Sequence, residues 1–141
     1  MSRVDLKSVW TDDDGMLQLD VGASNGRTSA RMELYAYPAD VLSFASGLKN
    51  FPANSKSEVV WESGGADPKW FGHMRLRAHV LDGSGHSALE IFMEVRGISP
   101  NSATSKFSLR CNPADLNEFG RKIETWLSEP SEQLTVEWRD A

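Results

Sequence analysis

Two stretches of the sequence nearly repeat each other: YPADVLSFASGL at residues 37–48 and NPADLNEFGRKI at residues 112–123. After each Pro-Ala-Asp triplet, apolar side chains recur at helical spacings, which is the pattern of one buried face of an amphipathic helix. A proline at the first helical position and an acidic residue in the first turn are both typical of a helix start. The sequence therefore predicts two helices with matching apolar faces. The matched positions are Val41, Phe44, Ala45, Leu48 and Phe51 in the first copy and Leu116, Phe119, Gly120, Ile123 and Trp126 in the second.

The repeat extends into the segments that flank the two helices. An alternating, strand-like segment precedes each helix, ARMELYAYP (30–38) and SKFSLRCNP (105–113). Another follows each helix and ends near a tryptophan, SEVVWES (57–63) and QLTVEWRD (133–140). With two further strands upstream, each half reads strand, strand, strand, helix, strand. The same elements also read, with a shifted frame, as four strands followed by a helix over residues 57–128.

These elements predict a single α+β domain over residues 1–141, built from two similar halves. We expect the halves to cover about residues 3–64 and 71–140, joined by SGGADPKW at residues 63–70. An amphipathic helix cannot bury its apolar face alone and needs the apolar face of a sheet. We therefore expect a mainly antiparallel sheet with both helices packed on it.

The segment GHMRLRAHVLDGSGHSALEIFMEVRG at residues 72–97 predicts a hairpin around the DGSG turn. If Leu81 faces His86, one face of the hairpin becomes nearly all apolar. The other face then carries charged pairs, and it places Arg75 opposite Phe92, a cation beside a ring. A slip by one residue would bury the arginines, so the pattern specifies this register strongly.

No set of residues predicts an active site. The histidines His73, His79 and His86 fall on the polar face of the hairpin, and a structural zinc would need four nitrogen or sulfur ligands. Cys111 falls on the inward side of its strand, where cysteine behaves as a small apolar residue. No nucleophile elbow or phosphate-binding loop is present, and the acidic run at residues 12–14 is typical of a solvated hairpin turn. We expect no enzyme activity, metal or cofactor.

The tryptophans fall into two groups. Trp61, Trp126 and Trp138 lie at positions predicted to face the core. Trp70 lies in the joining segment beside Phe71, where an exposed aromatic pair can anchor a binding partner. The alternative is that the joining segment folds back and that these two rings cap the core.

Composition limits the function classes. The chain of 141 residues has a net charge of -5 and an isoelectric point near 5.2. Proteins that bind nucleic acid through its backbone place lysines and arginines against phosphates, so this charge disfavours nucleic acid as a partner. No apolar run has the length of a signal peptide or a membrane span, so we expect a cytoplasmic protein without a membrane partner.

The segments GHSALEIFMEVRG (85–97) and SKFSLRCNPADLNEFGRKIETWL (105–127) resemble small bacterial proteins of the WapI-type immunity kind. Such proteins share a glycine-led strand, a further alternating strand and a C-terminal amphipathic helix opened by an acidic residue. The resemblance covers about half of the chain. It implies a non-enzymatic protein that binds and neutralises a toxin domain, so the expected partner is another protein.

Two other function classes stay open. Strand-rich units closed by one helix and present twice also resemble the Whirly and PUR type of single-stranded nucleic-acid binder, in which Arg75, Arg77 and Phe92 would contact bases. Glu90 and Glu94 on the same face oppose that interpretation. A small-ligand site between the halves is the third class. The candidate interaction surface comprises Arg75, Arg77, Phe92, Trp70 and Phe71.

Overall fold

The computed structural model describes residues 1–97, 100–130 and 132–139. The end predicted for the second half, residue 140, lies outside these ranges. The elements in chain order are β1 (Ser2–Thr11), β2 (Leu17–Ser24), β3 (Ser29–Ala36), α1 (Pro38–Lys49), β4 (Glu58–Gly64), β5 (Gly72–Val80), β6 (Ser87–Val95), β7 (Ala103–Cys111), α2 (Pro113–Ser128) and β8 (Leu134–Trp138).

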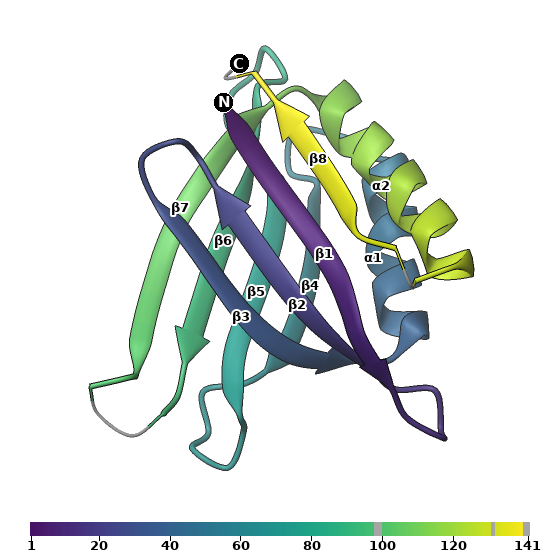
Figure 1. Ribbon diagram of the computed structural model, residues 1–141. Coiled ribbons are helices and arrows are strands. Elements are labelled where there is room, and N and C mark those ends of the chain that lie inside the picture. The colour runs from purple at the N-terminus through teal and green to yellow at the C-terminus, as the bar shows by residue number, and fades with distance from the viewer. Residues whose placement is uncertain (98–99, 131, 140–141) are drawn as a thin grey trace.

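In the described part of the chain the strands form two four-stranded antiparallel sheets, with orders β3-β2-β1-β8 and β4-β5-β6-β7. We call them sheet A and sheet B. They face each other, and the two helices lie against one another along one side of the pair (Figure 1). The α+β class and the antiparallel pairing are thus confirmed, and the elements follow the predicted order of three strands, a helix and a strand twice along the chain.

The strand order adds what the repeat alone did not indicate. The last strand of each half joins the sheet of the other half, because β4 pairs with β5 and β8 pairs with β1. The prediction of one sheet shared by both halves is therefore too simple, and each half contributes three strands to one sheet and one to the other. Each helix lies on the path by which the chain passes from one sheet to the other (Figure 1).

The predicted register of the β5–β6 hairpin is confirmed. The backbone N–H of Leu81 donates to the carbonyl oxygen of His86 at 2.6 Å, and Arg75 lies opposite Phe92. The apolar face of the hairpin is buried against the other elements. Alternation favours this register over a slip by one residue, because such a slip would bury the charged face.

The apolar faces of the two helices meet in one core with both sheets. All ten helix and post-helix positions matched in the sequence are buried. The predicted inward tryptophans Trp61, Trp126 and Trp138 are buried too, and each is at most 6% exposed. At the crossing of the helices, a side chain on Gly120 would place its Cβ 2.5 Å from the carbonyl oxygen of Ala45. The two helices can therefore approach this closely because position 120 has no side chain.

The helix ends follow the sequence prediction. Asn112 is the N-cap residue of α2, and its backbone N–H donates to the Asp115 carboxylate at 3.0 Å. The side-chain amide of Asn117 in turn donates to the carbonyl oxygens of Leu48 and Phe51, at 2.8 and 2.7 Å. It thereby ties the start of α2 to the C-terminal end of α1 and the residues that follow it. No helix among the described residues is long and apolar enough to cross a membrane.

The acidic run at residues 12–14 lies in the β1–β2 turn, as predicted. The Asp12 carboxylate accepts backbone hydrogen bonds from Asp14 and Met16, at 3.1 and 3.0 Å. A hydrogen bond between the two side chains lowers the pKa of Asp12 and raises the pKa of Asp14. The hydrogen bonds of Asp12 are therefore made within the turn itself, as is typical of an aspartate that stabilises a solvent-exposed turn.

Candidate functional site

An aromatic surface lies where the end of β3 and the start of α1 meet the β4–β5 loop. Tyr35, Tyr37 and Trp70 are each 45% exposed, which is high for such large rings. Phe71 lies beside them, half-buried, and its ring meets that of Tyr35 edge to face at 5.3 Å between centroids. We call these four residues the aromatic corner.

The corner joins the two sheets. Ser63 of β4 donates its hydroxyl hydrogen to the backbone carbonyl of Tyr35 at 2.7 Å, so the end of β3 is tied to sheet B. Tyr35 lies opposite Gln18, which in turn lies opposite Trp10. Trp10 is 58% exposed and is separated from Tyr35 by the polar side chain of Gln18.

The β4–β5 loop holds Trp70 in place through its backbone. The N–H of Trp70 donates to the carbonyl oxygen of Asp67 at 3.1 Å. The guanidinium of Arg96, just beyond β6, donates to the carbonyl oxygens of both Asp67 and Trp70, at 3.2 and 3.3 Å. The indole packs on Gly65, where an added Cβ would lie 3.2 Å from the ring. Trp70 is thus exposed but held, which lowers the entropy lost when a partner binds it.

The rings of the corner line a hollow of about 220 Å³ together with two acidic residues, Asp40 and Glu62. Asp40 lies in the first turn of α1, and its carboxylate has no hydrogen-bond or ion-pair partner among the described residues. Glu62 lies 2.5 Å from Nε2 of His73. A second hollow of about 490 Å³ shares Tyr35 and Phe71 with the first and continues along β3 toward Arg31.

The structure divides the predicted interaction surface into two places. Trp70 belongs to the corner, while Arg75, Arg77 and Phe92 lie on the outer face of sheet B. Phe71 packs on the core and Trp70 is exposed, so the pair is neither fully exposed nor fully a cap of the core.

Glutamates balance the arginines on the outer face of sheet B. Arg77 and Arg75 lie 3.4 and 3.8 Å from the Glu58 carboxylate. The ring of Phe92 meets His73 edge to face at 5.1 Å. One guanidinium nitrogen of Arg77, Nη1, is buried without a hydrogen-bond partner. The outer face of sheet B therefore carries arginines that are paired with acidic side chains, and it is not a basic surface.

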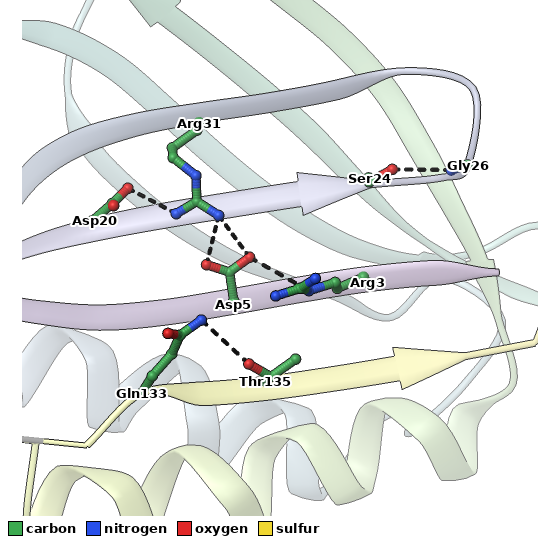
Figure 2. Close-up of polar contacts among 8 residues, drawn as sticks. All are labelled: Arg3, Asp5, Asp20, Ser24, Gly26, Arg31, Gln133 and Thr135. Carbon is green, nitrogen blue, oxygen red and sulfur yellow. Dashed lines mark hydrogen bonds and ion pairs between the residues drawn. The ribbon is translucent and has the colours of Figure 1, made fainter.

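A buried carboxylate lies on the outer face of sheet A (Figure 2). The side chain of Asp5 is 4% exposed, and both of its oxygens accept hydrogen bonds from Arg31, at 2.9 and 2.8 Å. Arg31 also donates to Asp20 at 2.9 Å, and Arg3 lies 3.8 Å from Asp5. Gly22 lies beneath the guanidinium, where a Cβ would come within 2.4 Å of it.

This cluster acts as a brace across three strands. Hydrogen bonds from Arg31 to Asp5 and Asp20 raise the pKa of the guanidinium above its usual value, so Arg31 stays charged. Because Arg31 already occupies both oxygens of Asp5, that carboxylate is not available as a general base. Asp5 lies between Val4 and Leu6, which face the core, so alternation places it on the outer face, where its contact with Arg31 comes from a distant part of the chain.

The other residues considered for chemistry lie apart. The described residues contain no group of three or more His, Cys, Asp or Glu side chains placed to hold a metal ion. His86 lies 2.7 Å from Asp82 in the hairpin turn, and this contact lowers the pKa of Asp82. Cys111 is buried on the inward side of β7, as predicted, and burial raises the pKa of its thiol to about 12.

No protein-family model matches the chain, and a comparison with curated proteins finds no match either. A function for this chain is therefore inferred from the geometry of the molecule itself. Sequence reasoning singled out Trp70 and Phe71 but missed Tyr35, Tyr37, Asp40 and Glu62. The alternation in ARMELYAYP does place Tyr35 on the outward side of its strand, but nothing local indicates that β3 ends beside β4.

Proposed function

We propose that this protein is a non-enzymatic protein-binding module and that the aromatic corner is its contact surface. The observation that carries the proposal is the group of three half-exposed rings, Tyr35, Tyr37 and Trp70, the last of which lies on a loop held by Arg96. Tryptophan and tyrosine dominate the binding energy of protein interfaces because they bury much area at low entropic cost. A soluble domain rarely exposes several such rings together without a partner.

Charge favours a basic partner. The net charge of -5 would speed the encounter with a positively charged protein. Asp40 and Glu62 add carboxylates beside the rings of the corner. A toxin domain with a basic face is the partner that the resemblance to WapI-type immunity proteins implies, and we propose an immunity role of that kind.

The test is affinity capture from the native cell lysate with three forms of the protein. We expect the wild type to retain a specific protein and the Tyr37→Ser, Trp70→Ser double variant to lose it. The matched control is Leu81→Ser, because Leu81 is also 45% exposed but lies at the opposite end of β5. Retention of the same protein by the double variant, or capture of no specific protein by the wild type, would rule out the proposed surface.

The alternative is single-stranded nucleic-acid binding of the Whirly or PUR type. One observation favours it: β4 to β7 form one four-stranded sheet in chain order, and α2 follows directly. The paired glutamates on its outer face and the acidic total oppose it. Fluorescence anisotropy with labelled single-stranded DNA at low salt decides between the two. Binding in the micromolar range that Arg75→Ala or Phe92→Ala removes would support the alternative, and no binding would eliminate it.

A further inference from the structure

We propose that the hollow of the aromatic corner is a site for one arginine side chain of the partner. This inference rests on the proposed function, because it assumes that the corner is the contact surface. It goes further by specifying which type of side chain of the partner enters the hollow.

The rings supply the first part of the attraction. Tyr35, Tyr37 and Trp70 all line the hollow, and the faces of such rings attract cations. Trp70 already shows this property within the chain, since the ammonium of Lys69 lies 5.2 Å from the centroid of its ring. An incoming cation would find more than one ring within the same small volume.

Two acidic residues supply the second part of the attraction for a cation. Asp40 and Glu62 line the same hollow, and the Asp40 carboxylate has no partner among the described residues. The partial positive charge at the start of α1 offsets some of its charge, and His73 already pairs with Glu62. Asp40 therefore gives the hollow a carboxylate that no cation of the described residues pairs with, and this charge favours an incoming cation.

Size and shape select one side chain. Pockets for drug-sized ligands and cofactors measure about 300–1,000 Å³, and this hollow measures about 220 Å³. A planar guanidinium can stack on a ring and also donate two parallel hydrogen bonds to a carboxylate. An ammonium is more strongly hydrated and cannot make the paired contact, so we infer arginine and not lysine.

The experiment uses the full chain labelled with ¹⁵N and two small probes. N-acetyl-arginine amide carries the guanidinium, and N-acetyl-citrulline amide is its neutral analogue of nearly the same shape. We expect the arginine probe to shift the indole N–H signal of Trp70 saturably, with a Kd on the order of millimolar. The citrulline probe should bind at least about tenfold more weakly, since it lacks the charge. Equal shifts from both probes, or no shift from either, would overturn the inference.

Two variants test the carboxylates. Asp40→Asn and Glu62→Gln should each weaken binding of the arginine probe by about 1.5- to fivefold, as expected for loss of one charged contact at a partly exposed site. Glu137→Gln is the matched control, because it changes the net charge equally but lies opposite Arg3 in β8, at the other end of sheet A from Tyr35, and its affinity should stay the same. Spectra of the free variants check that each one is folded.

The outcome separates this inference from the proposed function. If the Tyr37→Ser, Trp70→Ser variant loses the captured protein while the two probes bind alike, the corner is the contact surface but the arginine site is wrong. If the arginine probe binds selectively and the double variant still captures the protein, the hollow binds a guanidinium but the partner contacts another surface.

Discussion

The rings of Phe44 and Phe119 meet edge to face with 6.4 Å between their centroids, and they occupy matching positions in the two halves. Each ring also contacts the tryptophan that follows its own helix. Phe44 lies 5.7 Å from Trp61, and Phe119 lies 5.8 Å from Trp138. Since Trp61 belongs to sheet B and Trp138 to sheet A, four rings in a row connect the two sheets through the two helices.

Substitution of either phenylalanine should show that these rings act together. Phe44→Leu and Phe119→Leu should each lower the free energy of unfolding by about 1–1.5 kcal/mol. The double variant should deviate from the sum of the two by about 0.5–1.5 kcal/mol, the coupling typical of an aromatic pair. Urea unfolding of the four proteins measures this coupling. Additive effects would mean that the two rings only fill volume.

Gly120→Ala should destabilise the crossing of the helices. The new Cβ would lie 2.5 Å from the Ala45 carbonyl oxygen, which is backbone and cannot move aside without separating the helices. We expect a loss of about 1–3 kcal/mol despite the better helix propensity of alanine. The control is Gly83→Ala in the hairpin turn, where an added Cβ meets nothing within 4 Å. A thermal melt in which both variants match the wild type would contradict the close approach.

Replacing Arg31 should lower the free energy of unfolding more than replacing its buried partner Asp5. Arg31→Met leaves the buried Asp5 carboxylate without its main partner, and we expect a loss of about 2–4 kcal/mol. Asp5→Asn leaves a guanidinium that is half exposed and can be hydrated, so the loss should be smaller, about 1–2 kcal/mol. Denaturant unfolding at neutral pH gives the order of the two. The reverse order would show that the burial of Asp5 matters less than its geometry suggests.

Cys111 should resist alkylation in the folded protein. The thiolate is the reactive form, and burial raises the pKa of this thiol to about 12 from 9.0. Iodoacetamide at pH 8 should label the native chain far more slowly than the chain in urea. Because the pKa is higher in the folded state, the thiol contributes stability that is present below pH 9 and is lost as pH rises toward 12. Equal labelling rates with and without urea would place Cys111 at the surface.

The sequence alone determined the elements of this protein that depend on local periodicity. Helical spacing after Pro38 and Pro113 specified α1 and α2 together with their buried faces. Alternation specified the β5–β6 register, because a slip by one residue would expose one face and bury the arginines of the other. These patterns indicate which face of each helix or strand is apolar and is therefore buried.

Only the tertiary structure decided which surfaces meet. The exchange of β4 and β8 between the halves, the burial of Asp5 under Arg31 and the contact of Tyr35 with Phe71 all join residues distant in the chain. An apolar face can be buried equally well against several partners, so its pattern does not name the partner. The packing of both sheets and both helices into one core selects a single arrangement, and that arrangement brings the aromatic corner together.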